Sequence, residues 1–225
     1  MINVNLSALV IGTAVPVLFG LAVDNTTERR KVALLIAAGA LIIAPALVVE
    51  LLLFAYGQKY FDPRVWAFLE AFVVAALIEE LLRLFAIQHL LRREPLQSTV
   101  DALKLGIWIS VGFAIVENVL YLIDSEGTDA LMLAAIRILM PTVMHAISGV
   151  ILAAGHANLT GLRPWSAFIL AVIFHGLYDW VLAWKLGLPL PLAVLALGFV
   201  VAGIGVRTAR KSDSIRQIGE RLGGR

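Results

Sequence analysis

Acidic and histidine side chains stand inside the apolar stretches of this sequence, where ionisable residues are rare. A charge at the centre of a membrane helix costs about 2.5–3.5 kcal/mol on insertion scales, so such groups face one another or water rather than lipid. Successive apolar stretches therefore have a reason to converge on one polar site. In chain order, the residues concerned are Glu79, Glu80, Arg83, Glu117, Asn118, His145, His175 and Asp179.

The spacing of these residues favours a shared site. Arg83 follows Glu79 by four residues and Glu80 by three, so on a helix it can pair with either carboxylate. His175 and Asp179 are also four residues apart. The aspartate can therefore hold one ring nitrogen and fix the tautomer of the imidazole.

Peptide hydrolysis is a reaction that such residues can perform. It requires a base to activate water, a donor for the oxyanion and an acid for the leaving amine. We expect Glu79 to act as the base, with Glu80, tied to Arg83, positioning it. Histidines and Asn118 can donate hydrogen bonds to the oxyanion. We therefore predict a peptidase that needs no cofactor.

Three alternatives use the same side chains. His145, His175 and a glutamate would suit zinc, with an open position for water, although the sequence holds no H-E-x-x-H motif. Buried acids and histidines also form proton relays, as in a proton-coupled transporter. An inactive protein that only binds partners is the third alternative. The absence of cysteine excludes a thiol nucleophile, and no G-x-S-x-G-like serine motif is present.

Apolar runs of about 20 residues, long enough to cross a hydrocarbon core of about 30 Å, must position these side chains. Of the 225 residues, 60% are hydrophobic and only 15% are charged. Only helices and closed barrels span a bilayer, and the runs lack the alternation of strands. The sequence thus predicts an all-α, polytopic membrane helix bundle. A net charge of +2 is too small to suggest a nucleic-acid partner.

We predict about seven transmembrane helices in a single domain over residues 1–206, followed by a basic tail, residues 207–225, that forms a short helix or stays loose. The oligomeric state stays open, because a homodimer is possible but no span carries a clean G-x-x-x-G stripe. Glu50 and Glu70 are interpreted as interfacial. The predicted spans are 5–23, 32–56, 66–91, 103–123, 129–159, 165–185 and 188–206.

Basic residues gather at alternate ends of these spans. The positive-inside rule places the richer ends in the cytoplasm, so we predict the N-terminus outside and the tail in the cytoplasm. The poorer ends carry Lys59, Arg64 and Lys185. The richer ends carry Arg29, Arg30, Lys31, Arg92, Arg93, Lys104, Arg163 and the basic residues from Arg207 onward.

Four short motifs on successive spans resemble the PrsW family of membrane peptidases, whose pattern reads E-E-x-x-[KR], F-x-x-x-E-N, a histidine span and H-x-x-x-D. The resemblance covers about residues 75–180. The chain is more distantly similar to the type II CAAX prenyl endopeptidases, in which the arginine stands one residue later and an asparagine replaces Asp179. In this sequence the motifs are Glu79-Glu80-Leu81-Leu82-Arg83, Phe113-Ala114-Ile115-Val116-Glu117-Asn118, Arg137 with Pro141 and His145, and His175-Gly176-Leu177-Tyr178-Asp179.

The resemblance implies a glutamic-type intramembrane peptidase in a prokaryotic cell membrane. Its substrates would be single-span membrane proteins, such as anti-sigma factors, rather than prenyl-proteins. The motif positions imply that the catalytic residues are Glu79, Glu80, Arg83, Glu117, Asn118, His145, His175 and Asp179.

Overall fold

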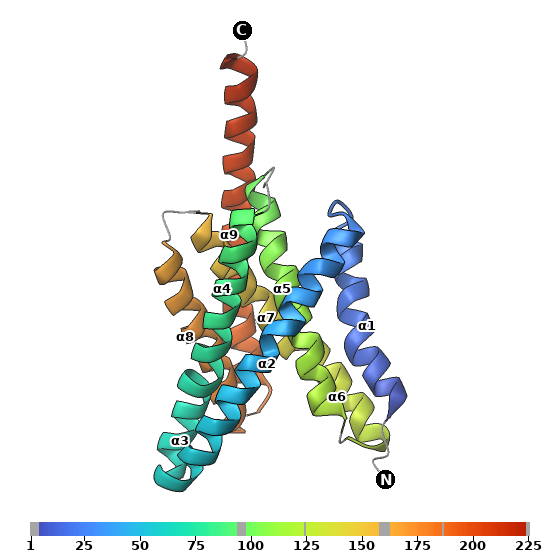
Figure 1. The fold of residues 1–225 in the computed structure, drawn as a ribbon, viewed down its shortest axis with the longest axis vertical. Helices are drawn as coiled ribbons and strands as arrows, with labels where there is room; N and C mark the ends of the chain where they lie inside the picture. Colours follow the sequence, from blue (N-terminus) through green and yellow to red (C-terminus); the bar gives the residue numbers. More distant parts are fainter. Residues whose placement is uncertain (1–4, 94–97, 124, 158–162, 186, 224–225) are drawn as a thin grey trace.

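The computed structural model describes residues 5–93, 98–123, 125–157, 163–185 and 187–223, and every regular element within them is a helix (Figure 1). The prediction of an all-α fold is therefore confirmed for these residues. In chain order the elements are α1 (Leu6–Val23), α2 (Arg29–Tyr60), α3 (Pro63–Leu69), η1 (Glu70–Leu77), α4 (Ile78–Arg93), α5 (Thr99–Leu122), α6 (Gly127–Leu139), α7 (Pro141–His156), α8 (Pro164–Ala183) and α9 (Pro189–Gly223).

Five helical stretches are long and apolar enough to cross a membrane, namely α2, α5, α6 together with α7, α8, and α9. Helix α1 is apolar but shorter. Large apolar side chains such as Leu41, Leu52 and Leu139 are exposed on the helix surfaces, as lipid-facing positions require. These observations support a multi-pass membrane protein, whereas the count of seven spans and the orientation stay predictions. The predicted end of the fifth span, residue 159, lies outside the described residues.

The predicted third span consists of α3, η1 and α4 in direct succession. Asp62 begins α3, because its side chain accepts a hydrogen bond from the backbone N–H of Arg64 and Pro63 follows at the first helical position. Residues Glu70–Leu77 form a π-helix, in which hydrogen bonds join residues five apart instead of four. The α-helix resumes at Ile78, so Glu79 and Glu80 lie in its first turn.

Helix α5 packs closely against α2 and α7. A Cβ atom on Gly106 would stand 2.3 Å from the carbonyl oxygen of Gly149 on α7, and one on Gly112 would stand 2.1 Å from the carbonyl oxygen of Ile36 on α2. Small residues let membrane helices approach until their backbones touch. This close approach brings Glu117 of α5 within reach of His145 of α7.

Helix α9 is longer than the predicted span 188–206, because it continues without a break to Gly223. Its C-terminal part projects beyond the bundle in Figure 1. The carboxylate of Asp213 accepts hydrogen bonds from the backbone N–H of Thr99 (2.8 Å), the Thr99 hydroxyl (2.7 Å) and the Val100 N–H (3.1 Å). It thus caps the first turn of α5 and ties the predicted tail to the bundle.

Asp24, in the turn between α1 and α2, is expected to make the stability of the fold depend on pH. Partial burial alone would raise its pKa, but hydrogen bonds from Thr27, Trp108, Lys104 and Thr26 hold the pKa of Asp24 well below its usual value. The Thr27 hydroxyl and the Trp108 indole donate at 2.5 and 2.9 Å. A depressed folded-state pKa stabilises the protein above the unfolded pKa of about 3.9, and this contribution is lost as the pH falls further.

The thermal unfolding midpoint in detergent should therefore change little through Asp24 between about pH 7 and pH 5 and fall below about pH 4. Asp24→Asn should lower the stability at pH 7 by about 1–2 kcal/mol and weaken the decline in acid. Glu126→Gln serves as the control, because Glu126 begins α6 without a capping bond from its side chain. Parallel acid profiles for Asp24→Asn and the wild type would contradict the prediction.

Candidate functional site

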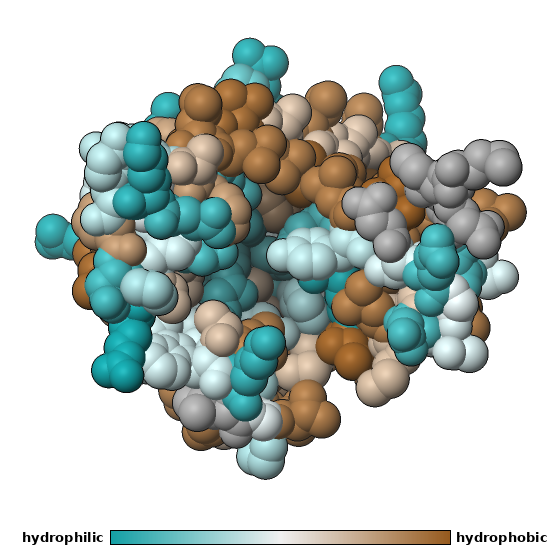
Figure 2. All heavy atoms as spheres, turned by 90° about the horizontal axis from the view of Figure 1, so that it is seen from below, coloured by the Kyte–Doolittle hydropathy of each residue, from teal (hydrophilic) through white to brown (hydrophobic). Residues whose placement is uncertain are grey.

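A cavity of about 690 Å³ lies among α2, η1 and α4–α8. Its wall includes Phe54 of α2, Ala67 of α3 and Ala183 of α8, and α3 lies at the lower end of the bundle in Figure 1. Figure 2 views the molecule from this side and shows a hollow with hydrophilic residues in its depth. The cavity thus faces the end of the bundle that the charge distribution predicts to lie outside. Its polar lining residues are Glu50, Glu70, Glu79, Glu117, Tyr121, Arg137, His145, His175, Tyr178 and Asp179.

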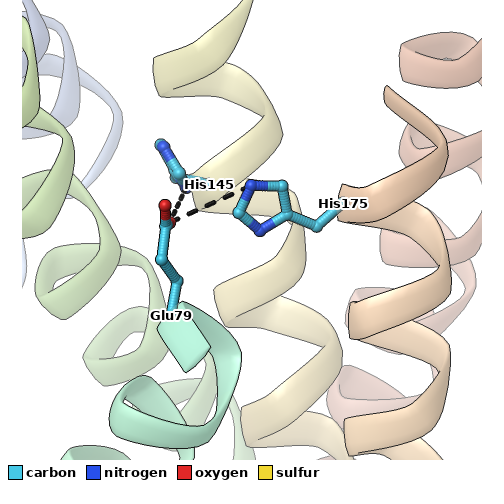
Figure 3. A group of neighbouring side chains, drawn as sticks. All are labelled: Glu79, His145 and His175. Carbon is cyan, nitrogen blue, oxygen red and sulfur yellow. Dashed lines mark ion pairs between the residues drawn. The ribbon is translucent and has the colours of Figure 1, made fainter. Parts of the chain in front are cut away.

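Three buried side chains from α4, α7 and α8 point toward one another in this cavity, as Figure 3 shows for Glu79, His145 and His175. Glu79 Oε2 lies 3.9 Å from His145 Nδ1 and 3.9 Å from His175 Nε2. One ligand atom from each residue lies within 4.8 Å of the other two. These separations exceed hydrogen-bond length, so the atoms surround a space rather than bond directly to each other.

Arg83 is fully buried behind Glu79 and contacts both acids. Its Nη2 lies 3.1 Å from Glu79 Oε2 and 2.8 Å from Glu80 Oε1, so the predicted pairing forms with both carboxylates. Its Nη1 donates a hydrogen bond to Ser148 Oγ at 2.8 Å, and the guanidinium lies 5.0 Å from the centre of the Phe113 ring. Arg83 therefore fixes the acidic pair of α4 against α5 and α7.

Glu80 holds His175 from outside the cavity. It has no exposed surface, and its Oε1 lies 2.8 Å from His175 Nδ1. The opposite ring nitrogen, Nε2, faces Glu79 and lies 3.1 Å from Asp179 Oδ2, so the predicted contact between His175 and Asp179 is confirmed. Of the two adjacent glutamates, Glu79 lines the cavity and Glu80 positions a side chain that lines it.

Glu117 holds His145 in the same way. Its Oε2 lies 2.7 Å from His145 Nε2, and its Oε1 lies 2.9 Å from Arg137 Nη2. Each histidine therefore has one nitrogen held by a carboxylate and the other directed toward Glu79, and at His175 the nitrogen that faces Glu79 also contacts Asp179.

Asn118 is buried and is not among the residues that line the cavity. Its amide donates hydrogen bonds to the carbonyl of Gly12 (2.9 Å) and the hydroxyl of Thr142 (3.2 Å), and its oxygen accepts one from Arg137 Nε (2.8 Å). These bonds connect α5 to α1, α6 and α7. The position of Asn118 thus favours a structural role over the predicted binding of an oxyanion.

The donor set of Glu79, His145 and His175 fits a divalent metal ion such as zinc. His145 Nδ1 is buried and has no hydrogen-bond partner in the described part of the chain. At His145 the Glu117 carboxylate on Nε2 keeps the proton there, which leaves Nδ1 free to bind a metal. Two histidines and one glutamate are a known ligand set of catalytic zinc sites, which keep one position open.

Sequence reasoning missed three residues that belong to the site. Glu50 and Glu70 were interpreted as interfacial, yet both line the cavity. Ser148 was not considered, although it stands one helical turn after His145 and accepts a hydrogen bond from Arg83. For Ser148 the spacing from His145 was a usable signal. For Glu50 and Glu70 no signal in the sequence distinguishes a cavity wall from the membrane interface.

Comparison with known proteins gives one family. The chain matches the model of the PrsW family, described as an intramembrane metalloprotease family, over residues 27–205. It is similar to proteins named Protease PrsW from Oceanobacillus iheyensis (29% identity, covering 64% of this chain and 66% of that protein) and Geobacillus kaustophilus (30% identity, 65% and 64%). A third such protein, from Bacillus subtilis, is 29% identical, with 68% and 71% covered. The chain spans just under two thirds of the length of the first two relatives. No solved structure matches it.

Proposed function

This chain belongs to the PrsW family of intramembrane metalloproteases. We propose that it hydrolyses a peptide bond of a membrane-anchored protein, and that Glu79, His145 and His175 of this chain form the active site. The observation that carries the proposal is the meeting of one carboxylate and two imidazoles, each imidazole held by a second carboxylate, in a cavity within a helical membrane bundle. We place the protein in a prokaryotic cell membrane, because its relatives are bacterial.

The substrate class that fits is a single-span membrane protein, such as an anti-sigma factor. The cavity is lined by apolar side chains as well as acids, so it suits a peptide that leaves the bilayer. Because the cavity faces the predicted outer end of the bundle, we expect the cleaved bond to lie in the outer half of the membrane or just beyond it.

We propose that Glu79, His145 and His175 hold a divalent metal ion, with zinc as the ion that fits their donor atoms. A bound zinc ion supplies a Lewis acid that polarises the carbonyl group and makes water more acidic. Asp179 is the acid best placed to move protons, because it lines the cavity, its side chain is 30% exposed, and its contact at the site is with His175 rather than an arginine. It takes a proton from water as the water oxygen bonds to the carbonyl carbon. It then gives that proton to the amide nitrogen as the C–N bond breaks.

The metal-independent route predicted from the sequence uses the same cavity. In that route Glu79 itself takes the proton from water, and Glu80 and Arg83 position it. The 3.1 Å contact between Arg83 and Glu79 supports this alternative, because it fixes the position of the Glu79 carboxylate in the cavity wall.

Chelation tests the two routes. The protein is purified in detergent and incubated with a panel of single-span membrane peptides, with and without 1,10-phenanthroline, and its bound metal is measured. We expect the chelator to lower cleavage by at least about 100-fold and zinc to restore it, because removal of the ion removes the Lewis acid. His145→Ala should lose bound metal as well as activity.

The other results separate the alternatives. Cleavage that persists in the chelator but disappears in Glu79→Gln would establish the metal-independent route. A folded wild-type protein that cleaves no peptide of a broad panel would favour the transporter or binding alternatives. Arg92→Met, at the exposed end of α4, is the control for general effects of substitution on that helix.

A further inference from the structure

Tyr178 carries a buried hydroxyl group that the fold itself does not use. The side chain is 1% exposed, and its Oη has no hydrogen-bond partner among the residues that the structure describes. Leaving a buried polar group unpaired costs about 1–3 kcal/mol, a cost that phenylalanine would avoid at the same position. Tyr178 also belongs to the wall of the cavity. Its partner is therefore to be sought in what the cavity binds.

Helix α8 presents Tyr178 next to the proposed reacting groups. Tyr178 follows His175 by three residues and directly precedes Asp179, and all three line the cavity. At about 100° per residue, the directions of Tyr178 and His175 differ by only about 60°. A Cβ on Gly176 would stand 2.4 Å from the ring of Phe72 in η1, so this close packing fixes the rotation of α8.

The two arginines at the site are held in ion pairs with its acids. Arg83 contacts Glu79, Glu80 and Ser148. Arg137 contacts Glu117 and Asn118.

The histidines and the second tyrosine of the cavity wall are less suited to donate a hydrogen bond to a bound substrate. His145 Nδ1 acts as an acceptor when Glu117 holds the opposite nitrogen, and His175 Nε2 already contacts Asp179 Oδ2 at 3.1 Å. Tyr121, the other tyrosine of the cavity wall, is 56% exposed and its ring lies 3.8 Å from the Arg137 guanidinium. Within the described wall, the Tyr178 hydroxyl is thus the buried, uncharged donor without a partner.

We propose that Tyr178 Oη donates a hydrogen bond to the carbonyl oxygen of the peptide bond that is cut, an inference that rests on the proposed peptidase function. The bond strengthens as water adds to the carbonyl carbon and the oxygen gains negative charge. The tyrosine keeps its proton throughout. When the C–N bond breaks, the carbonyl forms again and the hydrogen bond weakens. Tyr178 thereby takes the oxyanion-binding role that the position of Asn118 does not favour.

Tyr178→Phe tests this assignment because it removes only the hydroxyl. We expect kcat to fall about 10²- to 10³-fold, as when one oxyanion donor is lost, with KM little changed. Affinity for a phosphinic analogue of the cleaved peptide, whose tetrahedral group imitates the reacting carbon, should fall in parallel. The thermal unfolding midpoint should stay equal or rise, because no hydrogen bond within the protein is lost.

Tyr56→Phe is the matched control, since Tyr56 is 60% exposed on α2, its ring lies 4.4 Å from the ring of Tyr60, and it is not part of the cavity wall. It should behave as the wild type. An unchanged kcat in Tyr178→Phe, beside a wild type that cleaves, would overturn the assignment and leave the peptidase proposal standing. A kcat that falls only together with the unfolding midpoint would also overturn it, as a packing effect. A wild type without any cleavage would overturn both proposals.

Discussion

Glu79→Gln is expected to lower the cleavage rate by at least about 10³-fold, because the amide can neither accept a proton as a base nor bind a metal as a carboxylate does. The carboxylate faces His145 Nδ1 and His175 Nε2 at 3.9 Å each, so either chemical route loses its central group. Stability should change little, because the amide has nearly the same volume as the carboxylate and Arg83 keeps its ion pair with Glu80. Steady-state cleavage and thermal unfolding in the same detergent measure the two effects.

Glu80→Gln makes the same change one residue away, on a side chain that does not reach the cavity. Its charge balances Arg83 and holds His175 Nδ1, so we expect stability to fall by about 1–3 kcal/mol. Activity should fall about 10- to 100-fold, as for partners that orient a catalytic histidine. An inactive Glu80→Gln beside an active Glu79→Gln would reverse the roles assigned to the two acids.

Arg83→Met should destabilise the protein by about 3–5 kcal/mol, since it leaves two buried carboxylates without their cation. It also leaves Ser148 Oγ without its donor and removes the guanidinium from above Phe113. The result would be seen as a lower unfolding midpoint and a lower yield of folded protein. Arg83→Lys should give an intermediate loss, because one ammonium group cannot match a guanidinium that bonds Ser148 through one nitrogen and both acids through another.

A triple variant shows whether the unpaired carboxylates cause the loss of stability in Arg83→Met. Adding Glu79→Gln and Glu80→Gln to Arg83→Met leaves no unpaired charge among these three residues, so most of the lost stability should return. If it does not, Arg83 stabilises the bundle mainly by packing over Phe113. The control Arg92→Met, at the exposed end of the same helix, should stay within about 0.5 kcal/mol of the wild type.

The helical contacts of the site could be predicted because local spacing determines them. Arg83 meets Glu79 and Glu80, and Asp179 meets His175, at the separations that bring side chains together on one helix face. The convergence of α4, α5, α7 and α8 followed from the cost of isolated charges in lipid.

Properties that depend on packing between helices could not be predicted. Glu79 and Glu80 differ only in direction, and the neighbouring helices decide which one faces the cavity. The sequence predicts Asn118 as a donor for an oxyanion, but in the fold its amide donates hydrogen bonds to Gly12 and Thr142. The fit to a metal depends on which histidine nitrogen each carboxylate holds, and no spacing in the sequence contains that information.

The π-helix that precedes the acidic pair determines the phase of the third span. Glu70 and Glu79 are nine residues apart, and in an uninterrupted α-helix such residues lie on opposite faces, at about 100° per residue. Both nevertheless line the cavity, because each residue of the segment Glu70–Leu77 turns the chain through a smaller angle. Deleting one residue within 71–77 would leave Glu70 and Glu79 eight residues apart, and in a continuous α-helix such residues lie only about 80° from each other. Both side chains would therefore still face the cavity, and Glu79 and Arg83 would keep their places. The π-helix thus accommodates one additional residue between Glu70 and Glu79 while both side chains keep their direction toward the cavity.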